Sequence, residues 1–210
     1  MRRSDCRLWA SSIYRFMQTV SIDAQKRDNL GKKNSRAARR EGLVPGVIYG
    51  GEDTVHFTAP VKAFKSLLYT PDFKLAEITV DGTTYRCMVK STQFHPVTDD
   101  LEHIDLLQLV DGNTIKAEIP VRFKGVSPGV KAGGKLLRKM RRVKVKTQPE
   151  YLVDELHASI DGMELGSSIR VRDIEKPEGI EFMSALANPI ATVEVPRALR
   201  SAATKAEKEG

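Results

Sequence analysis

The stretch GKKNSRAARREG, residues 31–42, concentrates positive charge in a segment with helix-forming character. At about 100° per residue its five cations fall within an arc of roughly 120° of a helix. They are Lys32, Lys33, Arg36, Arg39 and Arg40. Ala37 and Ala38 fall on other faces, and Gly42 stands where such a helix would end. Like charges at i,i+3 and i,i+4 repel, so the pattern indicates either the binding of a polyanion or a solvated basic face.

A second concentration of positive charge spans residues 131–146, with eight Lys or Arg and no acidic residue. In the run RRVKVK the cations alternate with Val143 and Val145, so a strand would turn the charges to one face and the valines to the other. Phosphate contact is one interpretation of this segment. A solvated strand face is the default interpretation.

Few residues are candidates for catalysis. His103 and Asp105 in EHID alternate along a predicted strand and therefore share a face. Such a pair is of the type that orients a nucleophile, but no Ser or Cys has a suitable context. A surface or ligand-binding role is favoured, and a half-exposed strand face is the plain alternative.

Other chemical motifs are missing. The four histidines show no metal-ligand spacing. The stretch NLGKK lacks the first Gly and the final Ser or Thr of a phosphate-binding loop. We therefore expect no catalytic site, no cofactor and no metal.

Composition points to an acidic partner. The 210 residues carry a net charge of +7, which favours nucleic acid first and an anionic membrane surface second. No apolar run approaches the roughly 18 residues needed to span a bilayer. Cys6 and Cys87 are far apart, which fits a reducing cytoplasm better than a disulfide scaffold. Cys87 lies in a strand-like run and is expected to be buried or half-buried.

The elements that must position these residues are mostly short strands. Alternation and turn residues predict strands within 19–24, 44–51, 55–60, 76–90, 101–123, 141–147, 152–174, 178–183 and 189–196. Helices are predicted over 31–42 and 61–69, with Asp81-Gly82 as a hairpin turn and 124–136 as a loop. The pattern predicts a mainly β protein with a few helices, arranged as two β-rich domains.

We expect four segments along the chain. Residues 1–16 form a leader that is untranslated or disordered, and residues 197–210 form a flexible tail. Residues 17–110 form the first domain and residues 111–196 the second, with the boundary near 108–114.

Three motifs in order carry a resemblance to a known family. They are VPGVIYGG after the strand and basic helix, FHPVTDDLEHIDLLQL at 94–109, and IPVRFKGVSPGVKAGGKL at 119–136. Together they resemble the bacterial large-subunit ribosomal protein that binds 5S ribosomal RNA. The stretch GVSPGVKAGG marks the long two-domain form, called the general stress protein CTC type. The resemblance covers residues 19–196.

The resemblance implies an N-terminal β-barrel with helices that docks on 5S ribosomal RNA, followed by a second β domain on the ribosome surface. It implies a cytoplasmic structural protein, monomeric within the large ribosomal subunit, without enzymatic activity or membrane attachment. The RNA-binding residues carried over by motif are Arg27, Lys32, Ser35, Arg36, Arg39, Tyr49, Gln93, His95, His103 and Asp105. Lys33 and Arg40 complete the cationic helix face.

One position departs from the family pattern. Phe94 lies where many relatives carry an Arg, so one cation is missing beside Gln93 and His95, and Arg40 is placed to compensate. Two other classes of function remain as alternatives. One is a basic protein-interaction adaptor of the stress response, which would leave the helix face without a role. The other is a small hydrolase using His103 and Asp105, which would lack a nucleophile.

Overall fold

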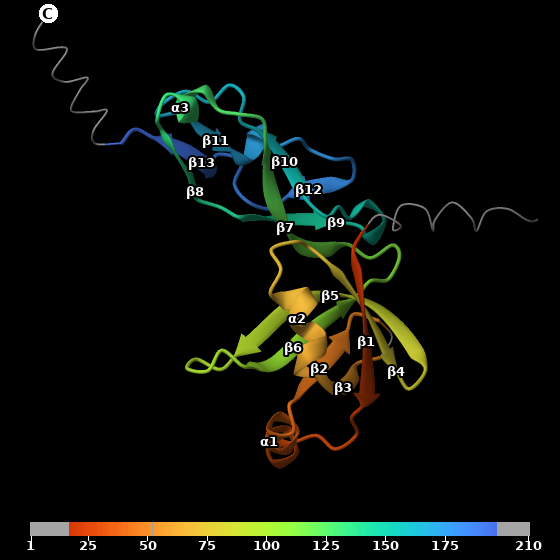
Figure 1. Ribbon diagram of the computed structural model, residues 1–210. Coiled ribbons are helices and arrows are strands. Elements are labelled where there is room, and N and C mark those ends of the chain that lie inside the picture. Colours follow the sequence, from red (N-terminus) through yellow and green to blue (C-terminus); the bar gives the residue numbers. More distant parts are fainter. Residues whose placement is uncertain (1–16, 52, 197–210) are drawn as a thin grey trace, which may run out of the picture. The chain divides into compact units, whose positions relative to one another are not determined.

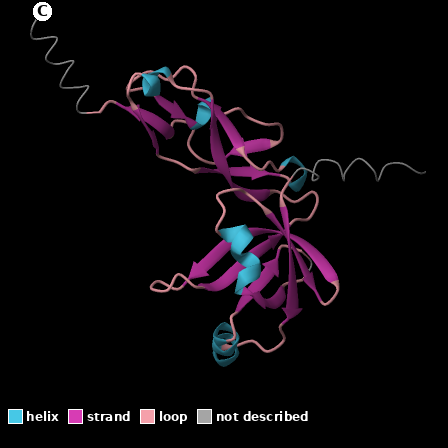
Figure 2. Cartoon of the chain, viewed as in Figure 1, coloured by secondary structure: helices cyan, strands magenta, loops and turns pink. Residues whose placement is uncertain are grey.

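The computed structural model describes residues 17–51 and 53–196 (Figure 1). The predicted leader, residues 1–16, and the predicted tail, residues 197–210, lie outside the described residues. The chain divides into two compact units. The first runs to Ile115 and includes Gln148–Asp154, and the second comprises Lys116–Thr147 and the chain from Glu155 onward. Both units consist mainly of strands, which confirms the predicted fold class (Figure 2).

The first unit is a closed barrel in the order β1-β3-β2-β6-β5-β4. Its strands are β1 (Thr19–Lys26), β2 (Leu43–Tyr49), β3 (Val55–Pro60), β4 (Leu75–Val80), β5 (Thr83–Phe94) and β6 (Leu101–Gln108). Two of the pairings are parallel. One joins β1 to β4 and closes the barrel, and the other joins β2 to β6.

The barrel core is mainly aliphatic, with Phe57 and Phe64 as buried aromatic side chains. Its largest fully buried side chains include Phe57, Ile48 and Ile104. Cys87 is also fully buried, as predicted. Burial raises the pKa of the Cys87 thiol to about 12, so the thiol stays protonated at neutral pH.

The predicted hairpin turn joins β4 to β5. Asp81 and Gly82 both have positive φ, 49° and 84°, which is the conformation that a two-residue hairpin loop of this twist requires. The predicted helices are also present. One is α1 (Lys32–Arg40), and the segment 61–69 divides into η2 (Val61–Phe64) and α2 (Lys65–Leu68).

The second unit contains two small sheets. The strands of the four-stranded sheet, in the order β10-β7-β9-β12, are β10 (Leu156–Ser159), β7 (Ile115–Lys124), β9 (Arg142–Thr147) and β12 (Ile180–Phe182). The three-stranded sheet contains β11 (Ser168–Arg170), β13 (Pro189–Glu194) and β8 (Lys135–Arg138). Two short helical turns also lie in this unit, α3 (Pro128–Lys131) and η4 (Val171–Asp173), whereas η3 (Pro149–Tyr151) lies in the segment that belongs to the first unit.

One local expectation differs from the structure. The predicted loop 124–136 contains α3, because the buried Ser127 hydroxyl accepts from the Val130 N–H and Pro128 occupies the first turn. The two runs within 101–123 belong to different sheets, since β6 closes the barrel and β7 lies in the four-stranded sheet, and the expected boundary near 108–114 falls between them. The predicted alternation of β9 is confirmed, with Val143 and Val145 buried.

Candidate nucleic-acid interface

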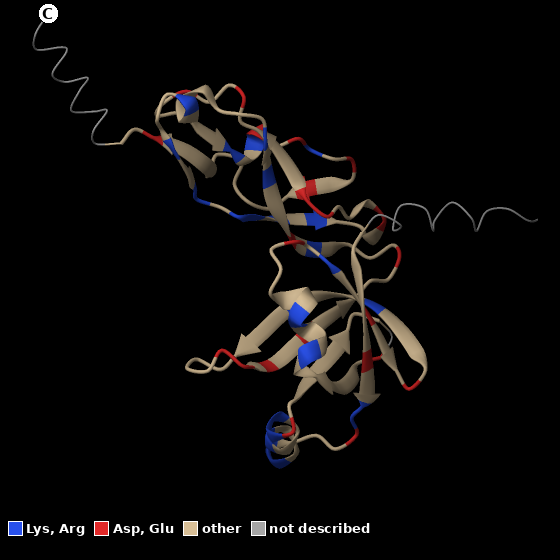
Figure 3. Cartoon of the chain, in the orientation of Figure 1, with Lys and Arg blue, Asp and Glu red and all other residues tan. Residues whose placement is uncertain are grey.

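Helix α1 presents its cations to solvent. The half-buried Ser35 and Ala38 are three positions apart and mark the side of the helix that faces the barrel. All five cations are exposed and lie away from that side. Figure 3 shows the helix as a concentrated block of Lys and Arg. Among the described residues, Lys32, Lys33, Arg36 and Arg40 form no ion pair.

The start of α1 is tied to the barrel by Arg27. The Arg27 backbone N–H donates to the carbonyl of His56 on β3, at 2.9 Å. Its guanidinium donates to the Ser35 hydroxyl at 2.9 Å and to the Asn29 carbonyl at 3.1 Å. The Ser35 hydroxyl in turn donates to the Gly31 carbonyl at 2.9 Å. Arg27 and Ser35, both predicted as RNA contacts, therefore also fix the position of the helix.

The end of α1 is tied to β6 by Arg39. Its guanidinium Nε donates to the backbone carbonyl of Glu102 at 3.1 Å. Gly42 then adopts a φ of 76° and its N–H donates to the Arg39 carbonyl, which ends the helix where the sequence predicted. The cationic helix is thus held at both ends, and its second anchor lies on the strand that carries His103 and Asp105.

The outer face of β6 is continued by its two neighbours. Strand pairing places Gln93 opposite His103 and Ser91 opposite Asp105 on β5. It places Val47 beside Asp105 on β2. Because Ile104 and Leu106 of β6 point into the core, the alternate residues face outward. The structure therefore brings Gln93, His103 and Asp105 together on one surface.

His103 and Asp105 are close enough to act as a pair. The His103 Nδ1 lies 2.8 Å from the Asp105 Oδ1 and forms an ion pair when the imidazole is protonated. Among the described residues, no acceptor lies in line with the Nδ1 as a hydrogen bond would require. The contact involves one oxygen of the Asp105 carboxylate, which retains lone pairs able to accept from a ligand.

Tyr49 stands on the same side of the barrel, at the end of β2. Burial, and secondarily the negative charge of Asp105, raises the pKa of Tyr49 above its ordinary value. The hydroxyl therefore remains protonated at neutral pH and keeps its ability to donate a hydrogen bond. A half-buried ring with a polar tip suits contact with a ribose or a base edge.

His95 has a role that the sequence did not indicate. Its Nδ1 accepts from the backbone N–H groups of Val97 and Thr98, at 3.3 and 3.2 Å. The backbone N–H of His95 donates to the Asp100 carbonyl at 2.8 Å. His95 therefore shapes the turn between β5 and β6, and its Nε2 is the ring atom that can face a ligand.

Phe94 is exposed and paired with another exposed ring. Its centroid lies 6.4 Å from that of Tyr69 in an edge-to-face arrangement. Sequence reasoning missed both Tyr69 and Ser91. Ser91 had a usable signal, because it precedes Gln93 by two residues along the strand and must share its face. Tyr69 had none, because its contact with Phe94 depends on the tertiary fold.

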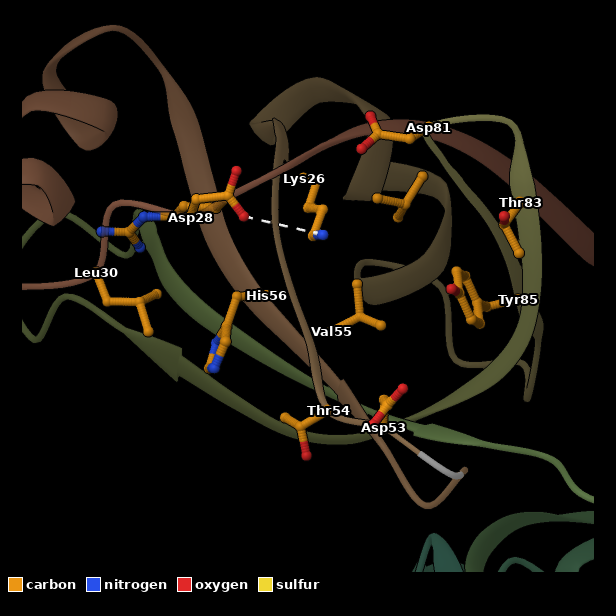
Figure 4. Close-up of a pocket in the computed structure, with 12 residues that line it drawn as sticks. Lys26, Asp28, Leu30, Asp53, Thr54, Val55, His56, Asp81, Thr83 and Tyr85 are labelled. Carbon is orange, nitrogen blue, oxygen red and sulfur yellow. Dashed lines mark ion pairs between the residues drawn. The ribbon is translucent and has the colours of Figure 1, made fainter.

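A groove at one end of the barrel adjoins this surface at Arg27 (Figure 4). It is lined by residues of β1, β3 and the β4–β5 hairpin, and Lys26 and Asp28 form an ion pair there at 3.9 Å. Asp53 and Asp81 add two further carboxylates. These three carboxylates offset the positive charges of Lys26 and Arg27, which also line the groove, and make it a poor site for phosphate.

The described part of the chain offers no other obvious chemistry. No group of three or more His, Cys, Asp or Glu in residues 17–51 and 53–196 could hold a metal ion. Within the same residues, no helix is long and apolar enough to cross a membrane.

Comparison with known proteins assigns both units. The Ribosomal L25p family model matches residues 22–106, and the model for the C-terminal domain of ribosomal protein TL5 matches residues 114–197. The large ribosomal subunit protein bL25 of Amoebophilus asiaticus is 39% identical over 92% of this chain and 98% of its own. The bL25 protein of Cytophaga hutchinsonii is 39% identical over 92% of this chain and 100% of its own.

The family resemblance drawn from the sequence motifs is therefore confirmed. The two family models match in the order in which the two units occur, and the similarity extends over nearly the whole chain. The chain belongs to the bL25 family of large ribosomal subunit proteins, which are structural components of the ribosome and not enzymes.

Proposed function

We propose that this chain binds 5S ribosomal RNA through its first unit, using the cationic face of α1 and the adjoining outer face of β5, β6 and β2. The motif resemblance supplies the identity of the RNA. The observation that carries the proposal is the double anchoring of α1. Hydrogen bonds from Arg27 and Arg39 hold exposed cations beside the strand surface of His103 and Asp105.

Helix and strand surface would perform different tasks. Phosphates along a duplex attract Lys and Arg regardless of sequence, and the Arg fork can contact phosphate oxygens with two hydrogen bonds. The strand surface offers neutral donors and acceptors on Gln93, Tyr49 and Ser91. Such groups suit the wide, shallow minor groove of RNA, where 2′-hydroxyls and base edges are accessible.

Asp105 would add discrimination. A carboxylate repels phosphates but accepts hydrogen bonds from guanine amino and imino groups or from a 2′-hydroxyl. One acidic residue among cations therefore favours an RNA that places a donor at that point. Within the ribosome we propose a monomer whose RNA-binding domain corresponds to residues 17–110 and whose second domain corresponds to residues 111–196.

The proposal is tested by titrating the full-length protein against 5S ribosomal RNA and against an unrelated RNA duplex of equal length at matched salt. We expect 5S RNA to bind at least tenfold more tightly at physiological ionic strength, because base and shape contacts add to a shared phosphate term. Equal affinities for the two RNAs would reject it.

A further inference from the structure

The second unit has its own cluster of exposed cations, at the segment that joins β8 to β9. Arg138, Lys139, Arg141 and Arg142 lie within five consecutive positions, and all four are exposed. We call these four residues the β8–β9 corner. Figure 3 shows Lys and Arg along this segment. Among the described residues, none of the four takes part in an ion pair.

The backbone of the β8–β9 corner is fixed by neighbouring strands. The N–H groups of Lys139 and Met140 both donate to the Ile190 carbonyl on β13, at 2.8 and 3.1 Å. The Arg141 carbonyl accepts from the Val121 N–H on β7, at 3.0 Å. The bend is therefore formed before any ligand arrives, which reduces the conformational entropy lost on binding.

Arg138 is additionally held by an aromatic ring. Its guanidinium carbon lies 5.4 Å from the centroid of Phe123, within the range of a cation–π contact. A guanidinium that rests on a ring keeps its N–H edges available for oxygen acceptors. Three of the four cations in the corner are Arg, the side chain whose planar fork best matches phosphate.

The neighbouring lysines of β9 behave differently. Lys144 lies 3.6 Å from the Glu118 carboxylate, and Lys146 lies 3.7 Å from the Glu181 carboxylate. The charges of these two lysines are therefore balanced by carboxylates on neighbouring strands, which is typical of a solvated strand face. The basic run 131–146 therefore contains two β9 lysines whose charges are paired with carboxylates, and the β8–β9 corner, whose four cations form no ion pair among the described residues.

We propose that the β8–β9 corner is a second RNA-binding site, which contacts the phosphate backbone of ribosomal RNA independently of the first unit. Like-charged residues crowded at a fixed bend repel one another, and a phosphate backbone relieves that repulsion. RNA is the polyanion available to a ribosomal protein. The chain would then hold ribosomal RNA at two points, one on each compact unit.

The test uses the full-length protein with Lys32, Lys33, Arg36 and Arg40 replaced by Ala, so that the α1 surface is removed. Binding to a short unrelated RNA duplex is measured over a range of salt concentrations. In this background we expect R141A/R142A to weaken binding about tenfold or more, and to reduce the slope of log affinity against log salt by about two. K144A/K146A removes the same charge from the same strand region and serves as the matched control, with an expected change below threefold.

Equal losses in the two double variants would overturn the proposal, because binding would then follow net charge alone. A background protein that binds the duplex no better than its R141A/R142A derivative would also overturn it. Polyglutamate of matched charge is the competitor for a protein partner, and it should displace the duplex poorly. Displacement as efficient as that by unlabelled duplex would assign the corner to an acidic protein instead. The titration of the unsubstituted protein with 5S RNA does not depend on any of these results, so the proposed function and this second site can fail separately.

Discussion

At the scale of single residues, the structure separates side chains that present the surface from side chains that build it. Arg27, Ser35 and His95 use part of their hydrogen-bonding capacity within the protein. Lys32, Lys33, Arg36 and Arg40 do not form ion pairs within the described chain. Replacement of the first group should alter the position of the surface, whereas replacement of the second should remove a contact.

Asp105 is the residue whose substitution best separates recognition from attraction. We expect Asp105→Asn to weaken binding to 5S RNA by roughly 1–2 kcal/mol, because a charged acceptor for a base or sugar donor is lost. Binding to an unrelated duplex should rise slightly or stay level, since a repulsive charge has been removed. Paired titrations at matched salt measure both effects. Tighter binding to 5S RNA would show that Asp105 has no specific partner.

Cys87 gives a prediction about pH. Its pKa is raised to about 12 in the folded state, against about 9 in the unfolded chain. Between these two pH values only the unfolded state releases the thiol proton. The contribution of Cys87 to the free energy of unfolding is therefore fully present below pH 9, and above pH 9 it falls by up to about 1.4 kcal/mol per pH unit.

Urea unfolding at pH 8 and pH 10.5 should therefore show a smaller loss of stability with rising pH in Cys87→Ala than in the unaltered protein. Cys87→Ala should also be less stable at both pH values, since a buried side chain is shortened. The pH dependence is the informative quantity. Identical pH dependence in the two proteins would contradict a raised thiol pKa.

At the scale of elements, α1 acts as a unit whose cations lie on one side. We expect Arg36→Ala to weaken 5S RNA binding by about 1–3 kcal/mol, as for a charge-assisted phosphate contact. Ala37→Ser on the same helix should change little. Lys65→Ala on α2 removes an equal charge from another element and should also change little. A loss at Lys65 as large as that at Arg36 would show that net charge alone drives binding.

Arg39 should behave differently from Arg36, because it also fastens α1 to β6 through the Glu102 carbonyl. We expect Arg39→Ala to weaken binding by more than Arg36→Ala and to raise amide hydrogen exchange along α1. Arg36→Ala should leave the exchange rates of the helix unchanged. Unaltered exchange in Arg39→Ala would show that the hydrogen bond contributes nothing to the position of the helix.

At the scale of the whole molecule, the barrel has a core drawn entirely from its own strands and helices. A fragment of residues 17–115 should therefore fold cooperatively and bind 5S RNA within about threefold of the full chain, since each matched contact lies inside it. Its unfolding free energy should be lower than that of the intact unit, because Gln148–Asp154 is missing. Denaturation followed by circular dichroism measures the unfolding free energy, and titration measures the affinity for 5S RNA. A folded fragment with little affinity would transfer the main RNA contact to the second unit.

Local patterns in the sequence were sufficient for much of this architecture. The alternation in RRVKVK, the helix over residues 31–42 and the Asp-Gly turn at 81–82 follow from short-range rules of side-chain period and backbone conformation. The shared face of His103 and Asp105 follows from the same period. These features depend on neighbours within a few residues.

Features that depend on distant residues could not be predicted. The expected domain boundary near 108–114 falls within the run 101–123, but the alternation of either half does not indicate which strands it pairs with. The anchoring of Arg39 to Glu102 and the contact between Tyr69 and Phe94 join residues far apart in the chain. The ion pair of Lys144 with Glu118, which distinguishes the lysines of β9 from the cations of the β8–β9 corner, could not be predicted from the sequence either.

The parallel closure of the barrel has a consequence for synthesis of the chain. Strands β1 and β2 share the neighbour β3, but β1 also pairs with β4 and β2 with β6, so each gains its second partner only after later strands are translated. Such long-range pairings delay folding until most of the unit has left the ribosomal tunnel. The anchor of Arg39 on β6 can form only after β6, the last strand of the barrel, has been translated. A nascent chain that ends before β6 therefore contains every cation of α1 but lacks the contact that positions the end of the helix. We expect such a chain to bind RNA without the selectivity of the complete barrel.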